Sequence, residues 1–286
     1  MTAPTQAVPH RSVRTRRIAF IYPERSLDRH YVKGDLVMSH IVSMLSATFP
    51  EGEDFFVRSV RHYADRVTDP ELKSQVAGFV GQEITHGREH RALNERLQDM
   101  GYPTRSVDRI VRAGLKRQER AFGPRYSLAV TAALEHYTAT IAEKLLTSER
   151  AQALLGNNEV RSLLLWHALE ESEHKAVAFD VFRTVVGDEK IRIRAMRNTT
   201  FLFLLSMVLH TLQSLVLDRT AYNPVRLLRS VAALRHSPFF ERDVIRNLRA
   251  YNQVGFHPDD RDNSELLERW RAELFGADGS LTDHLK

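Results

Sequence analysis

The chain of 286 residues contains no cysteine. Disulfides, iron–sulfur clusters, thiolate zinc sites and cysteine nucleophiles are therefore excluded. Any metal ion must be bound by histidines and carboxylates. The sequence also lacks glycine-rich phosphate loops, serine-centred nucleophile motifs and dinucleotide fingerprints, which removes several common enzyme classes.

The sequence has little excess charge of either sign, with 41 Lys+Arg against 36 Asp+Glu and a net charge of +5. No aromatic-interleaved basic patch, zinc finger or RNP-like string accompanies this excess, so we expect no nucleic-acid partner. The Pro/Thr/Arg-rich first 17 residues lack the apolar region of a secretory signal. We expect a flexible basic leader over residues 1–20 and a cytoplasmic protein.

Long apolar runs are rare, and the one over residues 201–217 comes nearest to a membrane segment. It has 17 residues and includes His210 and Gln213, whereas spanning a bilayer takes about 20 apolar residues. We expect a helix that is either buried or in peripheral contact with one leaflet of a membrane. Its apolar surface would also suit the wall of a channel for an apolar substrate.

Strand-like alternation is missing, and helical spacing of apolar residues dominates the chain. The pattern predicts an all-α protein: a bundle of four long helices over residues 21–190, followed by an apolar helix and a helical cap over 191–286 in the same domain. The helices are expected at about 34–47, 51–67, 70–100, 107–120, 126–151 and 160–186, with breaks at Pro50, 68–71, 101–103, 122–124 and 156–158.

Two helical segments carry acids and histidines at spacings that place them on one face. Glu83 and His86 are three residues apart, about one helical turn. His167, Glu171 and His174 are spaced four and then three apart, which makes a single stripe. The residues around this stripe are largely apolar, so a solvated polar face is disfavoured.

The acids of each predicted helix pair lie at similar distances along the chain from the turn that joins the two helices. Glu53 lies 15 residues before a turn at about residue 68, and Glu83 lies 15 residues after it. Glu135 lies about 16 residues before the loop at 151–158, and Glu171 about 13 after it. Because equidistant positions face each other in an antiparallel pair, each pair presents a lone Glu opposite a Glu-x-x-His near mid-helix.

Four carboxylates buried together would repel one another and lose their hydration, so two divalent cations are expected between them. One Glu from each of two helices and Glu-x-x-His from the other two is the ferritin-like dimetal arrangement, which suits iron or manganese. The alternative is a metal-free polar core. In the usual division Glu83 and Glu171 bridge, Glu53 and Glu135 bind one ion each, and His86 and His174 complete the coordination.

Four segments, FPEGEDFF (49–56), QEITHGREH (82–90), LEHYTA (134–139) and WHALEESEHKAVAFD (166–180), resemble the bacterial family labelled "predicted metal-dependent hydrolase". The resemblance covers about residues 20–240 and implies a ferritin-like fold. His167 is similar to the extra histidine of the arylamine N-oxygenase branch of di-iron enzymes. That second likeness implies a seventh ligand, two iron ions and O2 as co-substrate.

Several neighbouring residues compete with these ligands or support them. Glu51 is an alternative to Glu53, although the depth in the bundle and the motif match favour Glu53. Glu170 is an alternative to Glu171, because it lies four residues before His174 and three after His167, within helical reach of both. Weaker candidates follow. For His90 the alternatives are a hydrogen-bond partner of a ligand, a ligand itself, or a packed polar side chain. Tyr137 is expected to be either a redox-active or simply a packed ring. Asp180 and Lys175 are expected to orient the ligands, and Glu173 either to face solvent or to lie behind the ligands.

The sequence therefore favours a non-heme di-iron oxygenase or oxidase that acts on a hydrophobic or aromatic small molecule and takes electrons from a separate donor. A dimetal hydrolase of an ester or amide is the second hypothesis. A non-enzymatic metal-binding protein is the third. We expect a homodimer rather than a storage cage.

Overall fold

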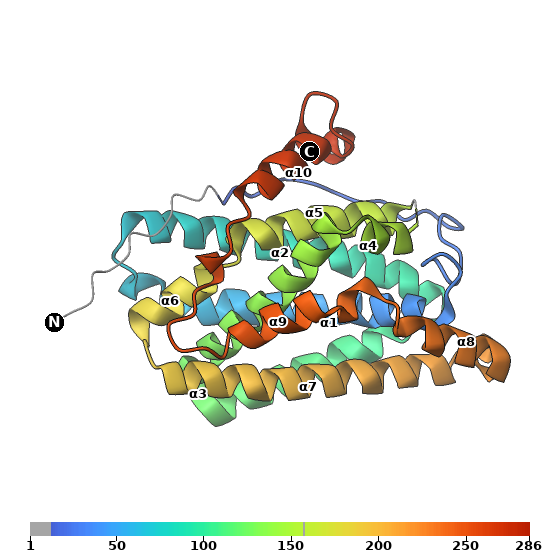
Figure 1. Ribbon diagram of the computed structural model, residues 1–286, viewed down its shortest axis with the longest axis horizontal. Coiled ribbons are helices and arrows are strands. Elements are labelled where there is room, and N and C mark those ends of the chain that lie inside the picture. Colours follow the sequence, from blue (N-terminus) through green and yellow to red (C-terminus); the bar gives the residue numbers. More distant parts are fainter. Residues whose placement is uncertain (1–12, 157) are drawn as a thin grey trace.

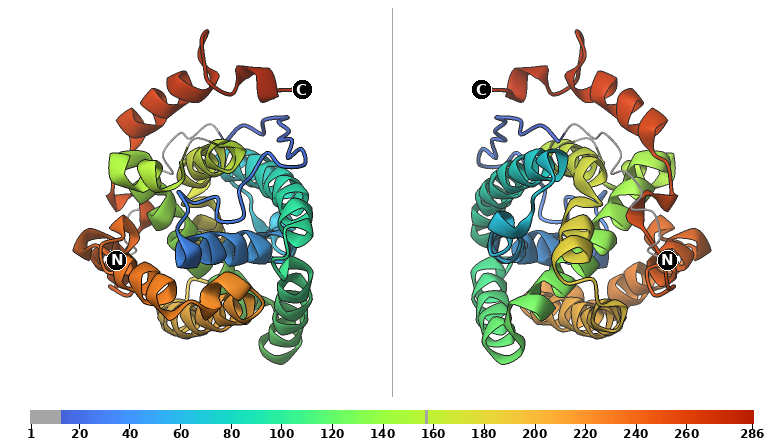
Figure 2. Two further views of the ribbon diagram at one scale, coloured as in Figure 1. Left: turned by 90° about the vertical axis from the view of Figure 1, so that its right-hand side faces the viewer. Right: turned by 90° about the vertical axis from the view of Figure 1, so that its left-hand side faces the viewer.

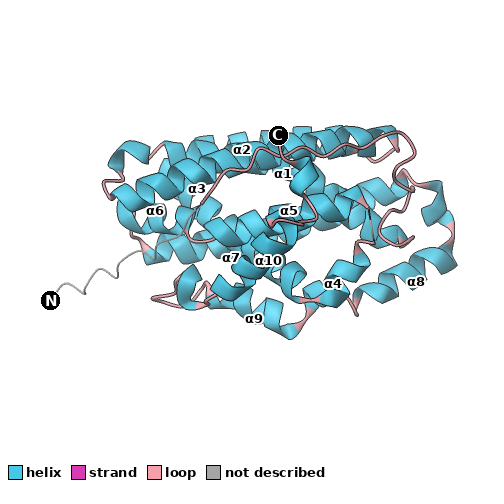
Figure 3. Cartoon of the chain, turned by 90° about the horizontal axis from the view of Figure 1, so that it is seen from above, coloured by secondary structure: helices cyan, strands magenta, loops and turns pink. Residues whose placement is uncertain are grey.

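The computed structural model describes residues 13–156 and 158–286. This part of the chain is helical, without strands, apart from one isolated bridge between Ile18 and Leu285 (Figure 3). The all-α prediction is confirmed. The helices are α1 (Leu36–Arg61), α2 (Pro70–Asp99), α3 (Thr104–Thr147), α4 (Glu149–Leu154), α5 (Glu159–His174), α6 (Val177–Val185), α7 (Glu189–Val216), α8 (Pro224–Leu234), α9 (Arg242–Ala250) and α10 (Ser264–Phe275).

The long helices lie lengthwise beside one another (Figure 1). α1 contacts α2, α3 and α7, and α3 contacts α5. Seen along the helices, α7 and α10 occupy opposite sides of the molecule (Figure 2). Two apolar clusters fill the interior, one around Met44 and Trp166 and the other around Phe55 and Phe79. The long helices run through both clusters, and they carry polar residues in the region between the clusters.

The start of α2 follows from its sequence. Asp69 Oδ1 accepts hydrogen bonds from the backbone N–H groups of Glu71 and Leu72, and Pro70 occupies the first helical position. An acidic cap and a proline at this position are both typical of a helix N-terminus, since proline has no N–H to leave unpaired. The restart predicted at 68–71 is confirmed.

The break predicted at Pro50 is wrong, because α1 continues through it. Proline removes the hydrogen bond that its own N–H would donate to the carbonyl four residues earlier. That carbonyl belongs to Ser46, and it accepts from Asn94 Nδ2 at 3.0 Å instead. A neighbouring helix thus satisfies the group that the proline leaves free.

Helical geometry is also interrupted at two other places. α3 is kinked at Gly123, where φ is 72°, and Pro124 follows, so the break predicted at 122–124 is present as a kink. The single helix predicted over 160–186 is instead α5 and α6, which are separated at Lys175 and Ala176. Lys175 Nζ donates to the carbonyl of Arg261 at this point.

A flexible leader is predicted over residues 1–20. Residues 1–12 lie outside the described residues, but residues 13–20 are packed on the bundle, so this part of the prediction is wrong. Residues 13–20 pack across α2, where Val13 and Thr15 approach two glycines of that helix so closely that a Cβ would not fit. The chain end holds this segment in place: Ala19 N donates to His284 O at 3.0 Å, and Lys286 N donates to Arg17 O at 2.8 Å.

Candidate metal centre

Seven acidic and imidazole side chains from four helices converge between the two apolar clusters. All of them are buried, with at most 3% of their surface exposed. The structure therefore brings together every ligand candidate of the predicted set. α1 provides Glu53, α2 provides Glu83 and His86, α3 provides Glu135, and α5 provides His167, Glu171 and His174.

The first group consists of Glu53, His86 and His167, whose ligand atoms all lie within 4.8 Å of one another. His167 Nε2 is 3.8 Å from Glu53 Oε1 and 2.9 Å from Glu171 Oε1. A cation at the middle of this group would take one carboxylate and two imidazoles from three different helices.

The second group consists of Glu83, Glu171 and His174, again within 4.8 Å. His174 Nε2 is 3.1 Å from Glu83 Oε1 and 3.3 Å from Glu135 Oε2. The two groups adjoin, because His86 Nδ1 is 3.7 Å from both Glu83 Oε1 and Glu171 Oε1. Glu83 and Glu171 thus lie between the groups, where bridging carboxylates are expected.

Hydrogen bonds outside the cluster fix which nitrogen of His167 carries the proton. Ser46 Oγ donates to Asn94 Oδ1 at 2.8 Å, so it accepts from His90 Nδ1, also at 2.8 Å. His90 Nε2 then accepts from His167 Nδ1 at 2.8 Å. His167 Nε2 is left without a hydrogen, and its lone pair faces the carboxylates.

The other two imidazoles are held in the same way. His174 Nδ1 donates to Gln82 Oε1 at 2.8 Å, and His86 Nε2 donates to Glu170 Oε2 at 3.0 Å. When it is neutral, each ring therefore turns its unprotonated nitrogen inward, toward the carboxylates. A donor–acceptor partner behind each histidine that fixes its tautomer is a regular feature of metal sites.

The inward-facing atoms lack hydrogen-bond partners among the described residues. A buried polar group without a partner costs roughly 1–3 kcal/mol, and more when it is charged. Cations would satisfy all of these atoms at once, so the donor set fits two divalent ions better than a metal-free polar core. The atoms are both carboxylate oxygens of Glu53, Glu83 and Glu135, Oε2 of Glu171, Nδ1 of His86 and Nε2 of His174.

Burial and mutual repulsion perturb the acids of the cluster. Burial, reinforced by neighbouring carboxylates, raises the pKa of Glu53 and of Glu83 well above the usual value. It raises the pKa of Glu135 to about 7. Burial acts in the same direction on Glu171, but the adjacent imidazoles of His167 and His174 outweigh it and hold the pKa of that carboxyl well below its usual range. Metal ions would displace the protons that the raised groups hold.

The structure separates the two pairs of competing carboxylates. Glu51 Oε1 accepts from Arg112 at 2.9 Å, outside the cluster. Glu170 is engaged behind the first group, as described above. The second member of each pair, Glu53 and Glu171, is the one that faces the other ligand candidates.

An ion network behind the histidines includes two residues without a role in the sequence prediction, Arg16 and Gln82. Arg16 bonds to both Glu170 and Glu173 at 2.8 Å, and Arg271 Nε donates to Glu173 Oε1 at 2.7 Å. Gln82 Nε2 donates to Glu173 Oε2 at 2.9 Å, which orients its carbonyl toward the cluster. Arg16 gave no signal because it lies in a segment without a periodic pattern.

Two weaker candidates have their observed contacts elsewhere. The ring of Tyr137 packs against Phe203, with 5.5 Å between the centroids. Asp180 accepts from His257 at 3.0 Å and pairs with Arg183 at 3.1 Å. These contacts link the bundle to α7 and to the C-terminal segment and provide no support for a ligand.

A third acid–histidine group, which the sequence did not indicate, consists of His30, His40 and Asp218. Arg226 donates to His30 Nδ1 at 2.9 Å, so His30 Nε2 carries the proton and donates to Asp218 at 2.9 Å. Arg29 also pairs with Asp218 at 3.4 Å. Two arginines and a protonated nitrogen disfavour a cation, and the group serves as a hydrogen-bond network that ties the end of α7 to α1.

The orientation of His174 provides a direct test of this hydrogen-bond shell. We expect Gln82→Leu to weaken metal binding by roughly 10–100-fold, because the imidazole loses the partner that fixes its tautomer. Competition with a chelator measures the affinity. The control is Gln98→Leu on the same helix, whose amide accepts from Arg105 N away from the cluster. Equal affinities for the two variants would contradict the assigned role of Gln82.

Comparison with known proteins agrees with the metal-site geometry at the level of the family. No curated protein and no solved structure matches the chain. A family model described as "predicted metal-dependent hydrolase" matches residues 14–262, a range that includes all seven clustered side chains. The chain therefore belongs to the predicted metal-dependent hydrolase family.

Proposed function

We propose that this protein is a dinuclear metal enzyme whose seven clustered side chains hold two divalent ions. The observation that carries the proposal is the convergence of three inward-facing imidazole nitrogens with carboxylate oxygens that have no hydrogen-bond partner among the described residues. Glu83 and Glu171 would bridge the ions, since each faces both groups. Glu53 would complete one side and Glu135 the other.

We further propose iron as the metal and O2 as the co-substrate. Carboxylate and imidazole ligands suit iron, and two ferrous ions bound here would supply electrons for O2 reduction. The protein's own contribution is to exclude water, because each imidazole lies against an aromatic ring. The centroid distances are 4.9 Å for His86 and Trp166, 4.8 Å for His167 and Phe49, and 5.0 Å for His174 and Phe79.

These aromatic surroundings favour a hydrophobic or aromatic small molecule as the substrate. An apolar ring that stacks against such side chains loses little hydration when it is buried, whereas a charged substrate would lose much more. A reductant outside the cluster would have to restore the ferrous state after each turnover.

A second candidate function is supported by the family description, which names a hydrolase. Two ions held by the clustered carboxylates and imidazoles would supply the Lewis-acid activation of water that hydrolysis of an ester or amide needs. Glu170, whose pKa burial raises to about 7, lies behind His86 and would hold or release a proton near neutral pH.

The two functions separate in one experiment with defined metals. Metal-free protein is loaded with ferrous iron without oxygen and then mixed with O2, while O2 uptake and iron oxidation are followed by an electrode and Mössbauer spectroscopy. We expect rapid oxidation with about one O2 consumed per two iron ions, and slow oxidation in a Glu83→Gln control. Iron oxidised no faster than in the control, together with ester or amide hydrolysis by zinc-loaded protein, would favour the hydrolase.

A further inference from the structure

One face of α7 exposes large apolar side chains to solvent. The alternative that this run is buried is therefore wrong for most of it. By length and composition, the helix is apolar enough to cross a membrane, yet only 22% of its most apolar stretch is buried. The exposed residues are Phe201, Leu202, Leu204, Leu205, Val208, Leu209, Leu212, Val216 and Leu217.

The opposite face of α7 is of mixed polarity and packs on the bundle: it buries Ala195, Met196 and Leu215 together with several polar side chains. Thr199, His210, Thr211 and Ser214 are buried there. Hydrogen bonds fix the helix along its length: Gln213 Nε2 donates to Ser106 Oγ at 3.0 Å, and Asn198 Nδ2 donates to Tyr126 OH at 2.9 Å. An ordinary surface helix turns its most apolar face to the core, whereas α7 turns its most apolar face to solvent. The exposed apolar face of α7 therefore calls for an apolar partner outside the chain.

Basic residues border this apolar face at both ends. Lys190, Arg194 and Arg197 are exposed about three, two and one turns before Phe201. α8 continues the face beyond α7 with exposed Val225, Leu228 and Val231 and with exposed arginines. Between residues 190 and 235 the sequence has one acid, Asp218, which is buried and paired with Arg29. The surface is therefore apolar and positively charged, without exposed acids.

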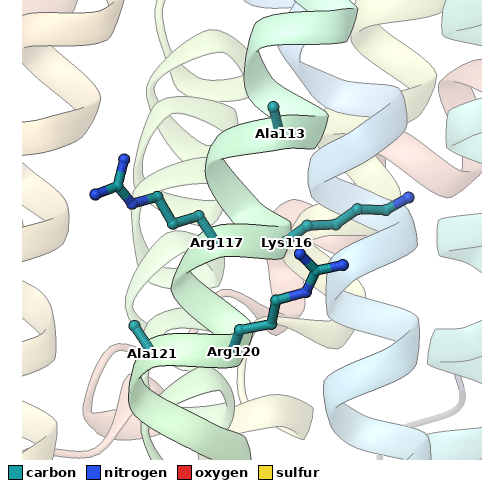
Figure 4. Close-up of a pocket in the computed structure, with 5 residues that line it drawn as sticks. All are labelled: Ala113, Lys116, Arg117, Arg120 and Ala121. Carbon is teal, nitrogen blue, oxygen red and sulfur yellow. The ribbon is translucent and has the colours of Figure 1, made fainter.

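The first half of α3 adds further positive charge beside α7. The two helices run side by side along the lower edge in Figure 1, and the Ser106 and Tyr126 contacts show that they are antiparallel. A hollow in the α3 surface between those contacts is lined by Lys116, Arg117 and Arg120. Figure 4 shows Arg117 pointing away from the other two, so the charges cover both sides of the helix.

We propose that the α7–α8 face, with the basic residues of α3 beside it, binds peripherally to a membrane that contains anionic phospholipid. Amphipathic helices that lie in the membrane interface combine an apolar face with Lys and Arg at headgroup level, as this face does. A second copy of the chain would bring the same positive charges to the same surface, which would repel. A spanning arrangement would expose the buried threonines and Ser214 to lipid.

Vesicle flotation tests the proposal with the full chain. Wild-type protein should float with phosphatidylcholine vesicles that contain about 30% phosphatidylglycerol, less with phosphatidylcholine alone, and less at high salt. Val208→Glu with Leu212→Glu should reduce the partition coefficient by at least roughly tenfold. Arg194→Glu with Arg197→Glu should remove most of the dependence on phosphatidylglycerol.

Matched variants control for the added charge. Ile21→Glu with Val254→Glu adds two acids at other exposed apolar positions, and Lys73→Glu with Arg25→Glu reverses two other exposed charges. Both controls should float like the wild type. Wild-type protein that stays unbound at both lipid compositions would overturn the proposal. So would conversion of a dimer to a monomer by the Val208/Leu212 variant without lipid binding by the wild type, which would make this face a contact between copies. Neither outcome bears on the metal centre.

Discussion

Replacing Glu83 by glutamine is expected to weaken metal binding strongly, because this carboxylate lies between the two groups of ligand candidates. The loss of affinity should exceed the roughly 10–100-fold that is lost when a hydrogen-bond partner behind a ligand is removed. At the same time the metal-free protein should become more stable. Glutamine has the shape of the acid but no charge, and burial already raises the pKa of Glu83 well above its usual value. Metal analysis and thermal unfolding of both forms measure the two effects.

The control is Glu51→Gln, an acid on α1 that pairs with Arg112 outside the cluster. That variant should keep two bound ions and gain no stability when metal-free. If Glu83→Gln binds two ions with wild-type affinity, Glu83 is not a ligand. If it destabilises the metal-free protein, the acids are not held in mutual repulsion.

Removal of the metal should destabilise the protein strongly, and increasingly so as the pH rises. Without ions, Glu53, Glu83 and Glu135 have a higher pKa in the folded protein than the usual 4.5. Their contribution to stability is therefore complete below about pH 4.5 and is lost as the pH rises through the folded pKa. For Glu135 the folded value is about 7, which corresponds to a loss on the order of 3 kcal/mol.

His174 acts in the same direction. Burial alone would lower its pKa, but the facing carboxylates of Glu135 and Glu171 outweigh burial and raise it well above 6.5. Bound ions would replace all of these protons. The difference in melting temperature between metal-loaded and metal-free protein should therefore widen between pH 5 and pH 7.5. Groups outside the cluster titrate alike in both forms, so they cancel. A constant difference over this range would contradict the assignment.

Local sequence patterns sufficed for the helical class and for the ligand candidates. Glu83 and His86, or His167 and Glu171, share a face because of helical spacing alone, and equal depth from a turn brings Glu53 to the same level. These inferences need only the helix period and the assumption that neighbouring helices are antiparallel.

Contacts between distant segments could not be predicted in this way. The helix continues through Pro50 because Asn94, on another helix, takes the free carbonyl of Ser46. Arg16, which donates a hydrogen bond to Glu170, lies in a segment that has no periodic pattern. The tautomer of His167 depends on a chain of three hydrogen bonds that crosses helices. Each of these features belongs to tertiary packing, which spacing along the chain does not encode.

Anomalous diffraction from crystals of protein purified without added metal tests the central claim most directly. The account predicts two metal peaks about 3.5–4 Å apart, as in other dinuclear sites, with Glu83 and Glu171 between them. A map that shows no metal among the seven side chains, or a single ion bound by other residues, would contradict it.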